Sequence, residues 1–154
     1  MKVLISDKLS KNAVIIFEDR GIEVDYFPNL TREEFKKIIP NYEGLAIRSN
    51  TKVDKEIIYL ANKLKIIGRA GIGIDNVDVE AATSKGIIVM NTPHGNSITT
   101  AEHTIAMIMS LARSIPDAHL STKLGKWEKS KFLGTEIFGK CLGLIGCGNI
   151  GSIV

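Results

Sequence analysis

The glycines of Gly146–Gly151 form the pattern G-x-G-x-x-G, which is typical of turns that bind a dinucleotide. The pattern follows the apolar run Lys140–Gly146, which predicts a strand, and this is the context that the pattern requires. Gly146 permits a tight turn, Gly148 lets backbone N–H groups approach a pyrophosphate, and Gly151 lets the next helix pack closely. The alternative is a glycine-rich turn between a strand and a helix that binds no ligand.

Two further segments, each at the end of an apolar run, carry groups that bind small anions. Gly68–Asn76 is rich in glycine, so its backbone amides are accessible in a turn suited to a carboxylate or phosphate. Its last residues, Asp75 and Asn76, could instead cap the helix that follows, and the two roles are compatible. Arg48 ends another apolar run, and its guanidinium could hold a carboxylate or phosphate through two hydrogen bonds. The alternative for Arg48 is a solvated surface arginine.

Asn91–Ser97 is a third segment of this kind, because it also leaves an apolar run. Asn96 or Ser97 is suited to cap the helix that follows, and Asn96 could also reach a ligand. The carboxyl ends of parallel strands meet at one edge of a sheet, and ligands bind at that edge. We therefore expect the turns holding Arg48, Gly71 and Asn96 to gather at one edge and to form a pocket for a small acid.

The remaining reactive side chains do not form a catalytic or metal-binding set. Glu102 and His103 are neighbours on a predicted helix, so their side chains point about 100° apart and cannot act as a pair. The chain has three histidines and two cysteines, and their spacing fits neither a metal site nor a disulfide scaffold. Cys147 has no base beside it and is better explained as a small residue that fits the glycine turn. Trp127 is expected to anchor its polar segment onto the core.

Short apolar runs alternate with helical stretches over the first part of the chain. Helices are expected between the runs, including one that begins with a capping box of Thr31 and Glu34. Strands that alternate with helices in this way predict an α/β domain with a flavodoxin-like parallel sheet. The predicted strands are Lys2–Ser6, Ile22–Tyr26, Gly44–Arg48, Leu64–Gly68 and Ile87–Met90. After Asn91, apolar residues from Ile98 to Ile115 recur at helical spacing and predict one long helix with an apolar face.

The composition excludes several classes of protein. The chain has 154 residues, with 20 Lys and Arg against 17 Asp and Glu, so its formal charge is +3. This charge is too small for an electrostatic nucleic-acid site, and no basic stripe is present. No apolar stretch reaches the roughly 18 residues of a spanning helix, and the start lacks the apolar run of a signal peptide. We therefore expect a cytoplasmic protein that has neither a nucleic-acid nor a membrane partner.

These motifs, in this order and spacing, resemble the D-isomer-specific 2-hydroxyacid dehydrogenases. The resemblance implies a two-domain oxidoreductase that uses NAD to oxidise a small phosphorylated 2-hydroxy acid and that forms a homodimer or a higher homo-oligomer. It assigns residues 1–97 to the N-terminal part of a substrate-binding domain and residues 98–154 to the beginning of a Rossmann NAD-binding domain. The segments that carry the likeness are Ile47–Val53, Gly68–Val77, Ala81–Gly86, Val89–Ser97, Gly125–Glu128 and Gly143–Gly151.

The resemblance also implies roles for individual residues. Arg48, Ser49 and the backbone amides of Ala70 and Gly71 are expected to bind the phosphate or carboxylate of the substrate, and Asn96 is expected to line the same cleft. Asn149 stands where the family often has an arginine, which removes one possible contact with the pyrophosphate. The residues expected to contact NAD are Ile72, Gly146, Gly148, Asn149, Ile150 and Gly151.

The catalytic Arg, Glu and His of the family lie beyond Val154, so we expect this chain to be inactive by itself. In dinucleotide-binding domains, an acidic residue about 20 positions after the glycines binds the ribose. This position also lies outside the chain, so the sequence does not decide between NAD and NADP. The alternative to the amino-terminal part of a dehydrogenase is a non-catalytic module that binds small anions or supports assembly. A flavodoxin-like FMN or response domain is more distant, because no acidic cluster follows the strands.

Overall fold

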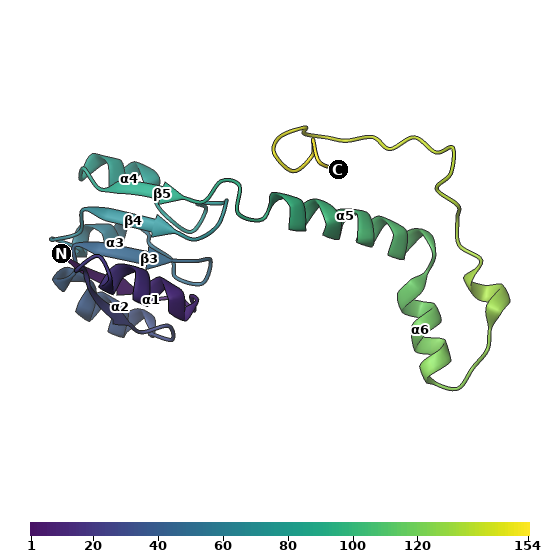
Figure 1. Ribbon diagram of the computed structural model, residues 1–154, viewed down its shortest axis with the longest axis horizontal. Coiled ribbons are helices and arrows are strands. Elements are labelled where there is room, and N and C mark those ends of the chain that lie inside the picture. Colours follow the sequence, from purple (N-terminus) through teal and green to yellow (C-terminus); the bar gives the residue numbers. More distant parts are fainter. The chain divides into compact units, whose positions relative to one another are not determined.

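Five parallel strands form one sheet in the computed structural model, which describes all residues from Met1 to Val154 (Figure 1). Their order in the sheet is β2-β1-β3-β4-β5, and every neighbouring pair is parallel. Each strand lies within two residues of its predicted range, so the prediction of a parallel α/β sheet is confirmed. The strands are β1 (Lys2–Ile5), β2 (Glu23–Tyr26), β3 (Gly44–Ile47), β4 (Ile66–Arg69) and β5 (Ile88–Asn91).

The helices between the strands begin where the sequence provides caps. Thr31 and Glu34 form the expected capping box: the Glu34 amide donates to Thr31 Oγ1 at 3.3 Å, and the Thr31 amide donates to Glu34 Oε2 at 2.9 Å. Asp54 and Asp78 cap the two helices after β3 and β4 by accepting from amides in the first turn. The helices are α1 (Lys11–Glu18), α2 (Arg32–Ile38), α3 (Lys55–Leu60) and α4 (Val79–Ser84), with a 3-10 turn η1 (Ile39–Asn41) after α2.

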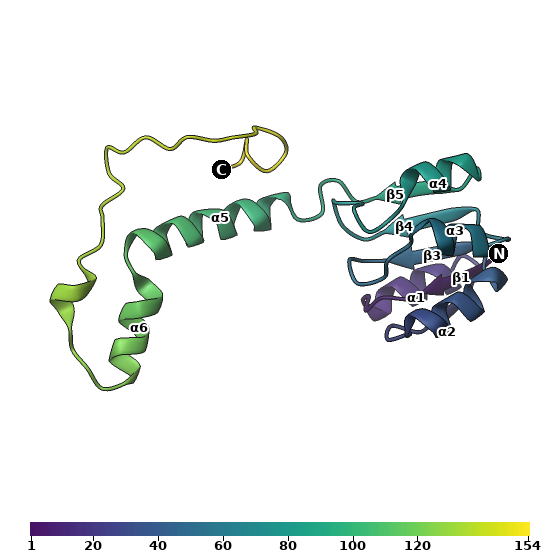
Figure 2. The same cartoon turned by 180° about the vertical axis from the view of Figure 1, so that it is seen from behind.

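The main core lies between one face of the sheet and helices α2, α3 and α4, whereas α1 lies on the opposite face (Figures 1 and 2). Ile67 of β4 is fully buried within this core, as are Leu4 of β1 and Ile57 of α3. On the opposite face, Ile88 and Met90 of β5 are 59% and 51% exposed. The sheet is therefore packed on one side through β1, β3, β4 and β5, and its other side is left open near β5.

The chain divides into a first unit, Met1–Gly95, and a second unit, Asn96–Val154. The second unit contains α5 (Ser97–Ala112), α6 (Ile115–Lys123) and a 3-10 turn η2 (Lys129–Phe132). The long helix expected to reach Ile115 ends at Ala112, and Ser114 in a left-handed conformation (φ 50°) separates it from α6, which lies where a second helical piece was expected at residues 117–124. No helix in either unit combines the length and the apolar character needed to cross a membrane.

Two predictions for the second unit are wrong. Lys140–Gly146 forms no strand, because no neighbouring strand supplies the backbone partners that an extended segment needs. Trp127 does not anchor the polar segment to a core, since its side chain is 83% exposed.

A buried tyrosine connects the first two strands with the segment before β3. The Tyr42 hydroxyl donates to Asp25 Oδ2 at 2.5 Å, and Lys2 Nζ lies 3.0 Å from the same carboxylate and 5.5 Å from the centre of the Tyr42 ring. Burial, together with the hydrogen bond to Asp25, raises the pKa of Tyr42 to about 12. The Tyr42 hydroxyl and the Lys2 ammonium lower the pKa of Asp25.

Tyr42→Phe is expected to reduce the loss of stability at alkaline pH. Folded Tyr42 keeps its proton up to a pKa of about 12, whereas an unfolded tyrosine ionises near pH 10. The unfolded state therefore binds fewer protons between these values, and the free energy of unfolding falls as the pH rises through this window. Urea unfolding at about pH 8 and about pH 11 checks this slope. An equally steep alkaline loss in the Phe variant contradicts the assignment to Tyr42.

Candidate functional site

The loops that follow β3, β4 and β5 are joined by backbone hydrogen bonds at the carboxyl edge of the sheet. The Ala70 amide donates to the Ile47 carbonyl at 2.8 Å, and the Thr92 amide donates to the Gly71 carbonyl at 3.0 Å. Further along, Val53 and Val77 form an isolated parallel bridge between the first two loops. The loops that hold Arg48 and Gly71 therefore lie side by side at one edge of the sheet.

Two arginines lie at this edge, whereas the sequence pattern predicted a binding role only for Arg48. Arg48 is exposed, and the residue before it, Ile47, is the register partner of Arg69 at the end of β4. Arg69 Nε is buried and has no hydrogen-bond partner. Gly71 gives the Arg69 guanidinium its space, because a Cβ at residue 71 would collide with it. The position of Arg69 at the end of the strand beside β3 was the feature that could have identified it.

The backbone amides of Ala70 and Gly71, expected to bind the substrate, are already occupied. Ala70 donates to the carbonyl of Ile47, and Gly71 donates to the carbonyl of Arg69 at 2.9 Å. These bonds belong to the end of the β3–β4 ladder and to the tight turn after β4. The Ile72 and Gly73 amides have no acceptor within the chain, so the available donors of this loop begin at Ile72.

Asn76 does not cap the helix after the glycine loop, and neither does Asp75. The cap of α4 is Asp78, whose Oδ1 accepts from the Ala81 amide at 2.9 Å. Asn76 Nδ2 instead donates to the carbonyl oxygens of Arg48 and Thr51, both at 2.7 Å. Asn76 therefore connects the glycine loop to the loop that carries Arg48.

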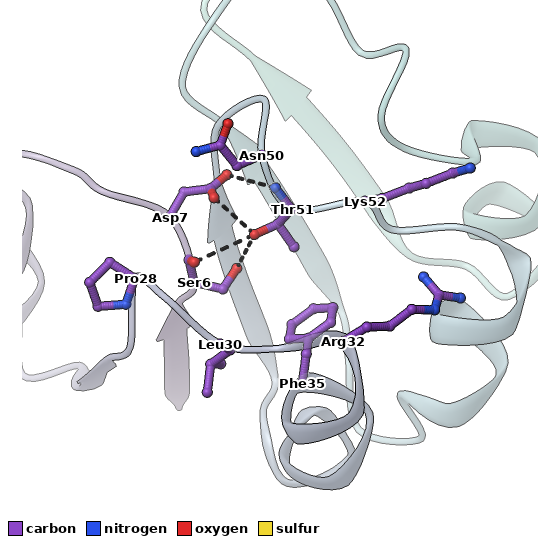
Figure 3. Close-up of a pocket in the computed structure, with 9 residues that line it drawn as sticks. All are labelled: Ser6, Asp7, Pro28, Leu30, Arg32, Phe35, Asn50, Thr51 and Lys52. Atoms are coloured by element: carbon purple, nitrogen blue, oxygen red, sulfur yellow. Dashed lines mark hydrogen bonds between the residues drawn. The ribbon is translucent and has the colours of Figure 1, made fainter.

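A cavity of about 340 Å³ opens at the same edge, between the loops after β1, β2 and β3 (Figure 3). Asn50, Thr51 and Lys52 line it, but none of the residues predicted to bind the substrate does. Its other lining residues are Ser6, Asp7, Pro28, Leu30, Arg32 and Phe35. The cavity is thus a neighbour of the Arg48 loop and not the predicted pocket itself.

Ion pairs hold one rim of this cavity. Arg32 binds Asp54 at 2.8 Å and Glu56 at 2.7 Å, and Lys36 binds Glu56 at 2.8 Å. The Lys36 and Arg32 cations lower the pKa of Glu56. Partial burial opposes ionisation of Asp54, but the Ile57 amide and the Arg32 guanidinium together lower its pKa. Because Arg32 is already paired with two carboxylates, it is a structural cation and not a free anion-binding group.

The glycine turn expected to bind a dinucleotide lies in the second unit and is exposed. Gly146 has φ +94°, and a Cβ at Gly151 would collide with the Gly146 carbonyl oxygen. The Ser152 amide donates to the Gly148 carbonyl at 3.0 Å, which closes one helical turn over residues 148–152. Only a single helical turn forms here, and the role of this turn in binding a pyrophosphate stays a prediction.

The other predicted site residues are found as follows. Ser49 is exposed on the Arg48 loop, and Ile72 lies on the glycine loop of the first unit. Asn96 is the first residue of the second unit, and its side chain makes no capping hydrogen bond to α5. No group of three or more His, Cys, Asp or Glu side chains is arranged to hold a metal ion. The remaining members of the glycine turn, Asn149 and Ile150, are exposed and half-buried respectively.

Comparison with known proteins gives one consistent family. Residues 3–146 match the family model described as D-isomer specific 2-hydroxyacid dehydrogenase, catalytic domain. The chain is 50% identical over 151 residues to a D-3-phosphoglycerate dehydrogenase from Archaeoglobus fulgidus, covering 98% of this chain and 29% of that protein. It is 55% identical over 150 residues to the human D-3-phosphoglycerate dehydrogenase, covering 97% of this chain and 28% of that protein.

A solved structure shares the fold of this chain. The TT0316 protein from Thermus thermophilus superposes with a TM-score of 0.90 at 32% sequence identity, covering 99% of this chain and 51% of that one. The chain thus spans less than a third of the length of the curated relatives it matches and about half of this structural neighbour.

Proposed function

Because the chain belongs to the D-isomer specific 2-hydroxyacid dehydrogenase family, we propose that it is the amino-terminal part of a cytoplasmic, NAD-dependent D-3-phosphoglycerate dehydrogenase. The reaction is the oxidation of 3-phosphoglycerate to 3-phosphohydroxypyruvate, which supplies serine biosynthesis. Residues 1–97 belong to the substrate-binding domain and residues 98–154 begin the NAD-binding domain. The complete enzyme is a homodimer or a higher homo-oligomer.

The observation that carries the proposal is the meeting of the Arg48 loop and the glycine loop at one edge of the sheet. The Asn76 side chain donates to the Arg48 carbonyl at 2.7 Å and so fixes one loop against the other. The edge combines an exposed guanidinium on Arg48 with unpaired amides on Ile72 and Gly73. Guanidinium and amide donors that converge in this way suit the carboxylate and phosphate groups of a small acid.

The residues of the chain bind and orient in this scheme, and they do not perform the proton transfer. Arg48, Ser49 and Arg69 hold the anionic groups of the substrate, and Asn96 lines the same cleft. The glycine turn Gly146–Gly151 holds the pyrophosphate of NAD, with Asn149 and Ile150 beside it and Ile72 on the substrate side. When held there, NAD would supply the hydride acceptor for oxidation of the hydroxyl-bearing carbon. The base that takes the hydroxyl proton belongs to the catalytic Arg, Glu and His set outside this chain.

Arg48→Ala is expected to weaken binding of 3-phosphoglycerate by about tenfold or more, because a hydrogen bond to a charged group contributes about 1.5–3 kcal/mol. Chemical shifts of a ¹⁵N-labelled chain during titration give the affinity and also show which amides respond. The expected responders in the wild-type chain include the Ile72 and Gly73 amides.

Arg20→Ala is the matched control, since Arg20 is an exposed arginine just after α1, before β2 begins. The control should bind like the wild-type chain. Equal affinity in the Arg48 and Arg20 variants would overturn the assignment of Arg48. Binding of 3-phosphoglycerate without any binding of NAD favours the non-catalytic anion-binding module over the dehydrogenase.

A further inference from the structure

A buried carboxylate lies under the loop that carries Arg48. Asp7 follows β1 and is 2% exposed. Its Oδ2 accepts from the Arg48 amide at 2.5 Å and from the Thr51 amide at 3.2 Å, and its Oδ1 accepts from the Thr51 hydroxyl at 3.0 Å. Figure 3 shows the Asp7 and Thr51 side chains pointing toward each other, with Ser6 beside them. One carboxylate therefore binds both ends of the four-residue segment 48–51.

The carbonyl groups of the same segment are held from the other side. Asn76 Nδ2 donates to the carbonyl oxygens of Arg48 and Thr51, both at 2.7 Å, although Asn76 lies on the glycine loop. The N–H groups of residues 48 and 51 thus donate to the Asp7 carboxylate, and their C=O groups accept from the Asn76 amide. This leaves the side chains of Arg48, Ser49 and Asn50 exposed on a segment whose ends are fixed.

The charge of Asp7 is opposite to what an anion site requires. A carboxylate close to such a site repels the ligand and lowers its affinity. Its presence there is explained if its hydrogen bonds to the loop outweigh that repulsion. We propose that Asp7 and Asn76 are positioning residues that clamp segment 48–51 and so hold the Arg48 guanidinium ready for an acidic ligand. The binding effect, though not the clamp, rests on the proposed function.

The clamp predicts different outcomes for two variants of Asp7, of which only Asp7→Asn keeps the size of the side chain. Asp7→Ala removes all three hydrogen bonds, and binding of 3-phosphoglycerate is expected to weaken by about tenfold or more. In Asp7→Asn the amide oxygen can still accept from the Arg48 and Thr51 amides, while the amide nitrogen donates to the Thr51 hydroxyl. Because this variant also loses the repelling charge, its affinity is expected to stay within about threefold of the wild type or to exceed it.

Hydrogen exchange of the Arg48 and Thr51 amides gives a readout that does not depend on any ligand. Exchange at both amides is expected to accelerate by about tenfold or more in Asp7→Ala and to remain slow in Asp7→Asn, because only the first variant leaves these donors unpaired. Asn76→Asp places acceptor oxygens against two carbonyl oxygens and is expected to weaken binding as Asp7→Ala does. Asp19→Ala, at an exposed aspartate after α1, is the control and should change neither readout.

Thr51→Val keeps the clamp testable if Asp7→Ala does not fold. It removes the hydroxyl bond to Asp7 Oδ1 but keeps both amide bonds, so a milder loss of affinity, about threefold, is expected. Equal affinity and equal exchange in Asp7→Ala, Asp7→Asn and the wild type would overturn the clamp. If the wild-type chain does not bind 3-phosphoglycerate, the proposed function fails at this edge, whereas the exchange comparison still decides whether the clamp exists.

Discussion

Mixed with NAD and 3-phosphoglycerate, the 154-residue chain is expected to produce no NADH above the uncatalysed background. Oxidation of the hydroxyl group needs a base that takes its proton, and a positioned base contributes about 10²–10⁴-fold to the rate. The chain offers no histidine for this task at the loops after β3 and β4. His94 is exposed in the loop after β5, and His103 and His119 lie on α5 and α6. The rate of NADH formation is therefore expected to be lower than that of a complete enzyme by at least this factor.

The absorbance of NADH at high chain concentration checks this expectation. A purified D-3-phosphoglycerate dehydrogenase from Archaeoglobus fulgidus, a relative with 50% identity, is a suitable positive control. Titration of the same preparation with 3-phosphoglycerate shows whether the chain is folded and binds, so that a lack of turnover is not confused with a lack of fold. NADH formation that increases in proportion to the chain and persists after further purification would refute the expectation.

Ile67→Ala is expected to lower the free energy of unfolding of the first unit by about 2–5 kcal/mol. Ile67 is fully buried and belongs to the core between the sheet and helices α2, α3 and α4. Truncation removes apolar contacts and leaves a cavity that close-packed neighbours cannot fill without strain. Because the loss is comparable to the total stability of many small domains, a large part of the variant is expected to be unfolded in mild denaturant.

Ile88→Ala is the matched control, because it makes the same chemical change in the neighbouring strand. Ile88 is 59% exposed on the open face of the sheet. Its replacement removes little buried surface, and a change below about 1 kcal/mol is expected from strand propensity alone. Urea unfolding of both variants, followed by circular dichroism, gives the comparison. Similar destabilisation by the two substitutions would show that the core is not concentrated on the α2–α4 side.

The parts of the fold that depend on local sequence could be predicted. The five apolar runs became strands because each is long enough to cross a buried sheet and is followed by a helical stretch or a turn. The capping box at Thr31 depends only on residues three positions apart. Lys140–Gly146 has the same apolar character, yet it forms no strand, because a strand also needs a partner and sequence spacing cannot supply one.

The candidate site was predictable in its loops but not in its contacts. Arg48 and the glycine loop could be placed at one edge because parallel strands share a direction. The clamp could not be predicted, since Asp7 lies 41 residues from Arg48 and Asn76 lies 28 residues from it. A capping role for Asn76 was the natural local interpretation, and only the fold shows its donors pointing to another loop. The acceptor of the Ala70 amide, the Ile47 carbonyl, could not be predicted for the same reason, because it belongs to the neighbouring strand.

Every buried residue of the first unit's main core lies between Leu4 and Ile87 in the sequence. Because the core is continuous in sequence, it affects when the first unit can fold during synthesis. Ribosomes add about 5–20 residues each second, and domains generally fold as units, the amino-terminal one first. A nascent chain that has released residues 1–95, which make up the whole first unit, already holds every buried side chain of this core. Folding of the sheet can therefore begin during translation, while later residues are still being added.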